Sequence, residues 1–192
     1  MNREQLSKLT LAGLFAAMAF VCFSYLRLEI PMGLGMTGKF YIGHTFIMLS
    51  ALLLGVKYGA LSGAIGLTIG DILAGYTTSA PPTFVAKFIL GATVAIIAHK
   101  VFHLSEETSG KKINFIILCS TIIGGVVNVI TEPLVRFSFK YFVLGWEKHV
   151  AYVSAMNCAV TEATGDVFSV ILCFVLYNAL ERSVLRNWKY DV

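Results

Sequence analysis

Long apolar runs alternate with short polar stretches along the chain. A helix needs about 20 mostly apolar residues to cross a bilayer, and six of the runs approach that length. We therefore predict an all-α membrane protein, a compact bundle of six transmembrane helices in which residues 1–192 form a single domain. The predicted spans are 8–26, 41–55, 58–74, 83–101, 113–131 and 151–179.

The composition supports this assignment. Of the 192 residues, 57% are hydrophobic and 14% are charged, whereas about a quarter of the residues of a soluble domain are charged. Six spans leave little chain for a separate catalytic domain. No small-residue cleavage site follows the first apolar run, so we expect a retained helix rather than a signal peptide.

The distribution of Lys and Arg predicts the orientation. An even number of spans places both termini on one side of the membrane, and nine of the 15 Lys and Arg residues would lie on that side. Cytoplasmic loops normally carry the excess of these residues. We therefore expect a multi-pass protein of the cell membrane with both termini cytoplasmic. No basic run interleaved with aromatic residues indicates nucleic acid as a partner.

Two connecting segments are longer than a tight turn requires. Residues 29–39 combine three glycines with apolar side chains, which suits a lid on the outer surface. Residues 133–148 mix aromatic and charged side chains, as segments at a membrane interface do. For both segments the alternative interpretation is a plain connecting loop.

Small residues predict where helices approach closely. Gly59, Gly63, Gly66 and Gly70 share one face of the third span and favour tight helix packing there. Ala12 and Ala16 form a small-xxx-small pattern in the first span. That pattern suits either internal packing or docking of a partner protein.

Ionisable residues within spans are costly in lipid and indicate function. Asp71 follows the glycine face, and Lys87 lies in the next span, so the two are candidates for an ion pair near the outer surface. Glu162 and Asp166 share one side of the sixth span and would repel each other if both were ionised. One of them must be protonated or paired with Lys87, a water chain or a ligand.

The polar residues of several spans converge near the same predicted outer ends, where Tyr41, Tyr76 and Trp146 also lie. Such a cluster is typical either of a ligand pocket or of a hydrogen-bond network between helices. As candidates for substrate binding we select Asp71, Tyr76, Lys87, Asn128, Glu132, Asn157 and Glu162.

No pattern of catalytic residues is evident. The sequence contains no H-E-x-x-H, G-x-S-x-G or Walker-type motif, and its four cysteines lie in apolar runs without metal-type spacing. We therefore expect neither an enzyme nor a metal or cofactor site. Energy for transport would come from an ion gradient or from a partner.

A series of short motifs follows one another across the second to fourth spans: His44–Gly59, Gly63-Ala-Ile-Gly66, Gly70-Asp71, Gly75-Tyr76, Ala80-Pro81 and Lys87-Phe-Ile-Leu-Gly91. In this order and spacing they resemble the substrate-binding S components of energy-coupling factor (ECF) vitamin transporters. The nearest branch is the riboflavin and hydroxymethylpyrimidine type.

The resemblance implies six spans with both termini inside and a vitamin bound at the outer face. It also implies association with a transmembrane coupling protein and two cytoplasmic ATPases. In this family an Ala-x-x-x-Ala pattern of the first helix meets the coupling protein, and Ala12 and Ala16 match it. The loop after the first span closes over the substrate, which fits residues 29–39.

The expected function is capture of a water-soluble vitamin or precursor from outside the cell for ATP-driven import by a partner ECF module. Hydroxymethylpyrimidine, pyridoxine or thiamine suits the mixture of amides, acids and aromatic rings. The alternatives are a stand-alone proton- or sodium-coupled transporter of a small polar metabolite and a structural or regulatory membrane subunit without a ligand.

Overall fold

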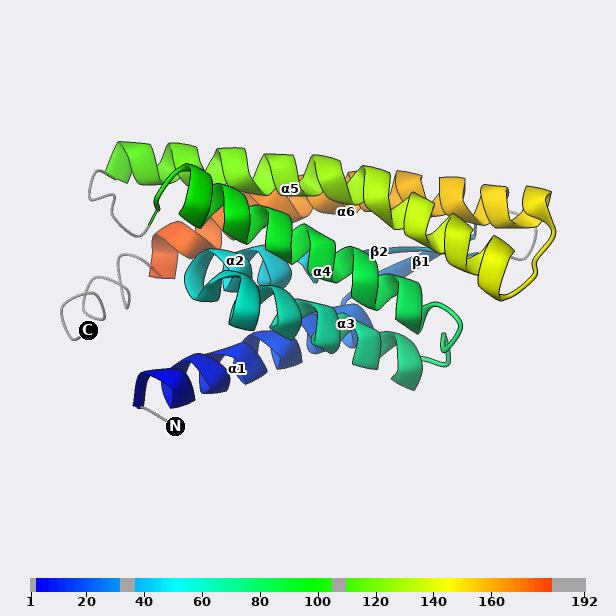
Figure 1. Ribbon diagram of the computed structural model, residues 1–192, viewed down its shortest axis with the longest axis horizontal. Coiled ribbons are helices and arrows are strands. Elements are labelled where there is room, and N and C mark those ends of the chain that lie inside the picture. The colour runs from blue at the N-terminus through cyan, green and yellow to red at the C-terminus, as the bar shows by residue number, and fades with distance from the viewer. Residues whose placement is uncertain (1–2, 32–36, 105–109, 181–192) are drawn as a thin grey trace.

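The computed structural model describes residues 3–31, 37–104 and 110–180, which form a bundle of helices with one short β-ribbon (Figure 1). The α-helices are α1 (Arg3–Tyr25), α2 (His44–Gly55), α3 (Leu61–Leu73), α4 (Ala80–Ile96), α5 (Gly110–Ser138) and α6 (Lys148–Leu180). Three π-helical turns, η1 (Val56–Ala60), η2 (Ile97–Val101) and η3 (Phe139–Val143), extend three of them. The ribbon consists of β1 (Arg27–Pro31) and β2 (Thr37–Tyr41).

Five helical stretches are long and apolar enough to cross a membrane: Arg3–Tyr25, His44–Leu73, Ala80–Val101, Gly110–Val143 and Lys148–Leu180. Large apolar side chains such as Leu14, Ile122 and Val167 point outward from them, as lipid-facing residues do. The prediction of an all-α membrane protein is confirmed. The number of crossings and the side on which the termini lie stay predictions.

The stretch His44–Leu73 does not run straight. Gly55 has φ = 71°, a left-handed conformation that glycine adopts at little cost, and the chain reverses there. The two arms then touch, because a Cβ on Gly59 would lie 2.2 Å from the backbone oxygen of Ser50. The Ser50 hydroxyl donates to the Gly59 carbonyl at 2.9 Å and joins α2 to the following turn.

The predicted glycine face is the surface on which α3 meets α1 and α2. A Cβ on Gly63 would lie 2.7 Å from Ile47, one on Gly66 would lie 2.3 Å from the Ala16 oxygen, and one on Gly70 would lie 2.6 Å from Phe23. These distances leave no room for a side chain. The prediction of close packing through these glycines is confirmed.

Gly66→Ala is expected to lower the free energy of unfolding by about 1–3 kcal/mol, because the new methyl group meets backbone that cannot rotate away. The matched control is Gly13→Ala on α1, where nothing lies within 4 Å of the added carbon. That change should be neutral or stabilising, since alanine is the better helix former. Unfolding in mixed detergent micelles measures both. Equal effects would contradict the close contact.

Several predicted helix boundaries differ from the structure by a few residues, and two of them lie at prolines. The fifth span was expected to end at residue 131, but α5 continues through Pro133 to Ser138. Lipid offers no hydrogen bonds to backbone N–H and C=O groups. Ending the helix early in lipid would leave several of these groups without partners, whereas one proline within the helix leaves fewer. Pro81 and Pro82 were expected in the preceding turn, yet they open α4, where the first turn needs no N–H partner.

The glycine-rich segment after α1 forms the antiparallel ribbon, in which Arg27 pairs with Tyr41 and Glu29 with Lys39. Residues 32–36 of the predicted lid lie outside the described part. The ribbon packs against α6, where Phe40 meets Phe168 edge to face at 5.4 Å. Arg3 and Leu180 lie at one end of the bundle, and the ribbon lies toward the other (Figure 1).

Candidate functional site

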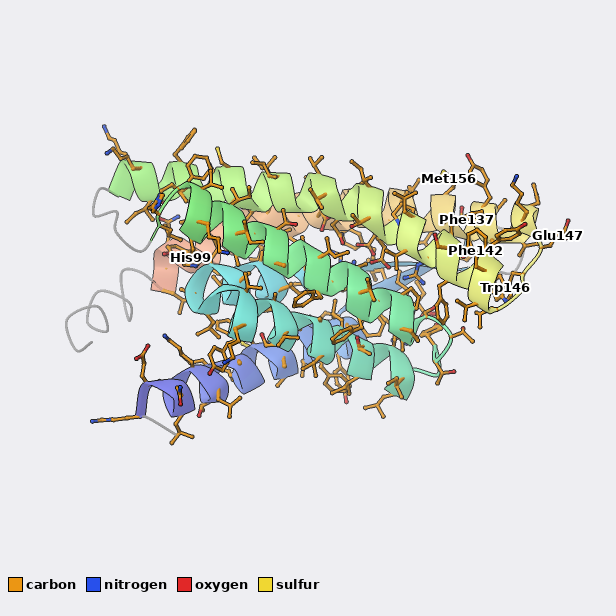
Figure 2. All side chains as sticks on the ribbon, viewed as in Figure 1. His99, Phe137, Phe142, Trp146, Glu147 and Met156 are labelled. Carbon is orange, nitrogen blue, oxygen red and sulfur yellow. The ribbon has the colours of Figure 1, made fainter. Side chains whose placement is uncertain are left out.

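A cavity of about 250 Å³ lies in the half of the bundle away from the described ends of the chain. Trp146, one of its lining residues, sits at the tip of the turn between α5 and α6, whereas His99 sits at the opposite end of the bundle (Figure 2). The aromatic residues in its wall are Phe23, Tyr41, Tyr76 and Trp146. The predicted gathering of the last three aromatic residues at one end is confirmed.

The seven predicted binding residues fall into two groups. Asp71, Tyr76, Asn157 and Glu162 line the cavity. Lys87, Asn128 and Glu132 are almost fully buried. Lys87 contacts Asn128, Glu132 and Glu162, and Asn128 also donates to Glu162. The structure thus brings them into one connected region, while their contact with a ligand stays a prediction.

Lys87 is the centre of the buried group. Its ammonium lies 2.6 Å from Glu162 Oε2, 3.1 Å from Glu132 Oε2 and 3.4 Å from Asn128 Oδ1. The predicted Asp71–Lys87 pair is wrong, because Lys87 lies on the side of α4 that faces α5 and α6. Of the partners considered for Glu162, Lys87 is the one observed.

Asp71 instead joins α3 to the ribbon and to α4. Lys39 donates to Asp71 Oδ1 at 3.0 Å, and the Thr83 hydroxyl donates to Oδ2 at 2.6 Å. Burial lowers the pKa of Lys39, while the Asp71 carboxylate opposes that shift. The Lys39 ammonium also lies 3.2 Å from the centre of the Tyr76 ring.

The ribbon has a second link to the wall of the cavity. The Tyr76 hydroxyl donates to Glu29 Oε1 at 3.0 Å. Together with the Lys39–Asp71 contact, this bond fastens both strands to the end of α3 and the turn after it. The ribbon therefore lies beside the cavity, and its role as a lid stays a prediction.

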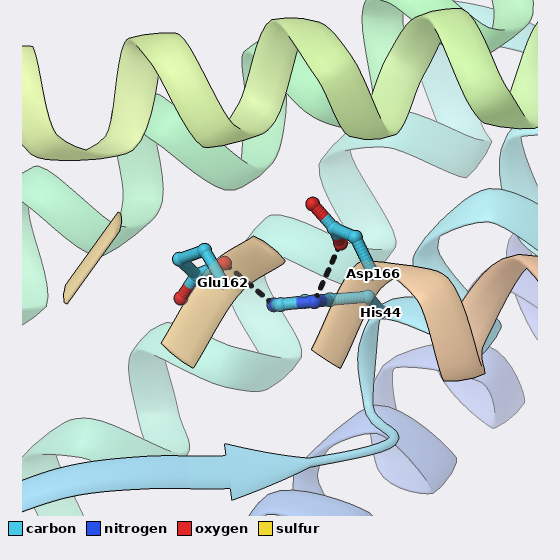
Figure 3. Close-up of side chains that lie close together, drawn as sticks. All are labelled: His44, Glu162 and Asp166. Carbon is cyan, nitrogen blue, oxygen red and sulfur yellow. Dashed lines mark ion pairs between the residues drawn. The ribbon is translucent and has the colours of Figure 1, made fainter. Parts of the chain in front are cut away.

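His44, which sequence reasoning did not select, lies between the two acids of α6 (Figure 3). Its Nε2 is 3.3 Å from Glu162 Oε2, and its Nδ1 makes a 2.9 Å ion-pair contact with Asp166 Oδ1. The Asn128 amide donates to Glu162 at 2.8 Å and to Asp166 at 2.9 Å. The predicted repulsion between the acids is thus relieved by shared donors.

The Tyr41 hydroxyl completes this group at 3.0 Å from His44 Nε2. Burial raises the pKa of Tyr41 well above its ordinary value, so its hydroxyl remains neutral. A neutral hydroxyl can both donate and accept. The Tyr41 hydroxyl can therefore donate to His44 Nε2 when that nitrogen carries no proton and accept from it when it carries one.

The spacing of His44, Glu162 and Asp166 would also allow them to hold a metal ion, as would that of Glu132, Cys158 and Glu162. In both groups, however, a side-chain cation already contacts the acids. Lys87 touches Glu162 and Glu132, and Arg136 touches Glu132 at 2.5 Å. We therefore describe the cluster as a network of ion pairs and assign it no metal.

Arg136 and Lys140 extend the site beyond the predicted residues. Arg136 donates to Glu132 at 2.5 Å and to Ser79 at 3.2 Å, and Lys140 donates to Ser154 at 2.7 Å. Both line the cavity. They follow Glu132 at intervals of four on the same helical face, a signal that was hidden by the expected helix end before Pro133.

Ala12 and Ala16 face the interior of the bundle in this structure. Ala12 is buried, and the Ala16 backbone packs on Gly66 of α3. The small residues beside them, Gly13 and Ala17, are exposed. The docking role of Ala12 and Ala16 stays a prediction.

This architecture is similar to that of a solved transporter structure. A structure titled "Structure and mechanism of the S component of a bacterial ECF transporter" is similar, with a TM-score of 0.63, 18% sequence identity, and coverage of 93% of this chain and 97% of that chain. At this identity the likeness shows the fold alone. No curated protein sequence matches. The model of a protein family described as the ECF-type riboflavin transporter, S component, matches residues 4–182. The chain therefore belongs to that family.

Proposed function

We propose that this S component captures a water-soluble vitamin or vitamin precursor at the outer face of the cell membrane. A transmembrane coupling protein and two cytoplasmic ATPases then drive its import with ATP. The chain is a multi-pass transport protein of the cell membrane, not an enzyme, and S components are the substrate-binding parts of ECF transporters. That the ligand is a vitamin or precursor, and that the chain works with these partner proteins, is what we propose.

The cavity carries this proposal. Its wall gathers four aromatic rings with acids, cations, an amide and hydroxyl groups from several elements. Aromatic surface beside polar groups that can fix the orientation of a ligand is a feature of ligand pockets. The aromatic faces would cover a flat ring, and the polar side chains would orient its substituents.

The size of the cavity favours a small ring system. Its volume of about 250 Å³ is near the lower limit of ligand pockets, which is roughly 300 Å³. A single pyrimidine or pyridine ring with short substituents fits such a space. We therefore favour ligands of the hydroxymethylpyrimidine or pyridoxine type, and thiamine, which adds a second small ring, is the largest of the three expected ligands. Riboflavin, named in the family description, is larger and would require the cavity to widen.

Six bilayer crossings with both termini in the cytoplasm are part of the proposal. Support comes from the reversal at Gly55, which divides His44–Leu73 into two arms. The described ends of the chain also lie together, opposite the half that holds the cavity (Figure 1). This arrangement would open the cavity to the outside.

A stand-alone proton- or sodium-coupled transporter was the alternative suggested by Glu162 and Asp166. Family membership favours an S component. The contacts agree, because both acids are already engaged by Lys87, His44 and Asn128. Uptake into proteoliposomes by an ion gradient, without ATPases, would support the alternative.

Identification of the ligand tests the proposal directly. Native mass spectrometry of the gently purified protein should reveal a co-purifying metabolite, and titration with hydroxymethylpyrimidine, pyridoxine, thiamine and riboflavin should rank their affinities. Tight binding of one compound is expected. If no water-soluble vitamin or precursor binds the full-length protein, the proposal is wrong.

Glu162→Gln is expected to weaken binding roughly 10- to 100-fold, the value of a hydrogen bond to a charged group. The contacts of Glu162 fall on Oε2, so among the described residues Oε1 is left to accept from a ligand. The matched control is Asp166→Asn, one turn away in the same network but outside the cavity wall. It should change affinity much less. Unchanged affinity in Glu162→Gln would remove Glu162 from the site.

A further inference from the structure

We propose that the ligand carries an anionic group, a phosphate or a carboxylate, and that Lys140 is the residue that selects it. This inference rests on the proposed function and narrows its substrate class to vitamin derivatives that bear such a group, since hydroxymethylpyrimidine and pyridoxine themselves are uncharged and thiamine is a cation. It is drawn from the charged groups and hydrogen-bond donors of the cavity wall that lack a charged partner or an acceptor among the described residues.

Lys140 is a buried cation without a buried counter-charge. It is 7% exposed and lines the cavity, and its ammonium donates to the neutral Ser154 hydroxyl at 2.7 Å. No carboxylate of residues 3–31, 37–104 or 110–180 lies within ion-pair distance of it. Buried charges are ordinarily paired, so a partner from outside the chain is expected.

The other cations of the site differ from Lys140 in this respect. Lys39 contacts Asp71 at 3.0 Å, Arg136 contacts Glu132, and Lys87 contacts two acids. The Trp146 ring lies 4.3 Å from the Lys140 ammonium and offers a cation–π contact, which stabilises the charge without neutralising it. Of these four cations, Lys140 is the one that has no carboxylate partner among the described residues.

The charges around the cavity are unevenly distributed. Asp71, Glu132 and Glu162 each lie within ion-pair distance of Lys39, Lys87 or Arg136, and Asp166 contacts His44. Within the described residues none of these acids reaches Lys140, so its charge is left uncompensated in a site of low dielectric constant, where this is costly. An anionic group of a ligand beside Lys140 would compensate it.

Two further donors point to a group rich in acceptor oxygens. The amide nitrogen of Asn157 and Nε of Arg136 are buried, and within the described residues neither has a hydrogen-bond acceptor. Both residues line the cavity together with Lys140. A phosphate or carboxylate supplies several acceptor lone pairs and pairs well with Arg and Lys.

The test compares matched neutral and anionic ligands in titrations of the full-length protein in detergent. The pairs are pyridoxal with pyridoxal 5′-phosphate, pyridoxine with 4-pyridoxate, and riboflavin with riboflavin 5′-phosphate. In at least one pair the anionic member should bind about 10-fold or more tightly than the neutral one, as a charge-assisted hydrogen bond predicts. The two kinds of pair distinguish phosphate from carboxylate.

Lys140→Met should abolish this preference, whereas Lys140→Arg should retain it. Lys57→Met, at an exposed lysine outside the cavity wall, is the matched control. The wild-type comparison needs no variant and stands even if Lys140→Met folds poorly. Equal affinity for both members of every pair that binds would overturn the inference and leave the proposed function intact. Failure of all six compounds to bind, with no vitamin or precursor found by mass spectrometry, would overturn both.

Discussion

Replacing Lys87 with methionine is expected to lower the free energy of unfolding by about 3–5 kcal/mol. Methionine fills much of the same space, so the loss is mainly electrostatic. It leaves Glu132 and Glu162, both almost fully buried, without the ammonium that lies 3.1 Å from one and 2.6 Å from the other. Reversible unfolding in mixed micelles measures the change.

A combined variant separates charge from packing. Adding Glu132→Gln and Glu162→Gln to Lys87→Met removes the stranded charges, so part of the lost stability should return. The exposed Lys57→Met is the matched control and should have little effect. If Lys87→Met were as stable as the wild type, Lys87 would not be the centre of the network.

Enlarging the small residues of α1 is expected to abolish uptake by preventing assembly with the coupling protein. Ala12→Leu combined with Ala16→Leu follows the family resemblance. Those residues also face α3, so the same change should loosen the bundle itself. Loss of uptake in that variant alone would not distinguish docking from internal packing.

The neighbouring positions make the distinction. Gly13 and Ala17 are exposed on the same helix, and no atom lies within 4 Å of a Cβ added at Gly13. Gly13→Leu with Ala17→Leu should block co-purification of the coupling protein and abolish uptake, with ligand affinity and stability unchanged. Thr164→Leu, at an exposed position of α6, is the control. Normal assembly of the Gly13 and Ala17 variant would argue against docking through this surface of α1.

The helices could be predicted from the sequence because lipid enforces long apolar runs, and the glycine spacing correctly indicated where α3 touches its neighbours. The end of the fifth helix could not be predicted, because the usual effect of Pro133 in water does not hold for a helix in lipid. That single error concealed Arg136 and Lys140.

The members of the site were easier to predict than their partners. Glu162, Asn128 and Lys87 were selected because polar groups in apolar helices are rare. The pairings depend on which faces of different helices meet, which one sequence does not reveal. Lys39 therefore replaced Lys87 as the partner of Asp71. His44 was missed as a site residue because it opens an apolar helix and its acidic partners lie on α6, far away in the sequence.

The short length of α2 bears on how deep in the membrane a ligand would be bound. Its 12 residues extend about 18 Å, less than a hydrocarbon layer of about 30 Å, so in the proposed orientation His44 at its start would lie below the outer surface of the membrane. The two strands before α2 pair their backbone groups with each other, which would let them cover the remaining thickness without water. A molecule reaching Glu162, which is 5% exposed, would have to give up most of its hydration there, and a misplaced polar atom of that molecule would be heavily penalised.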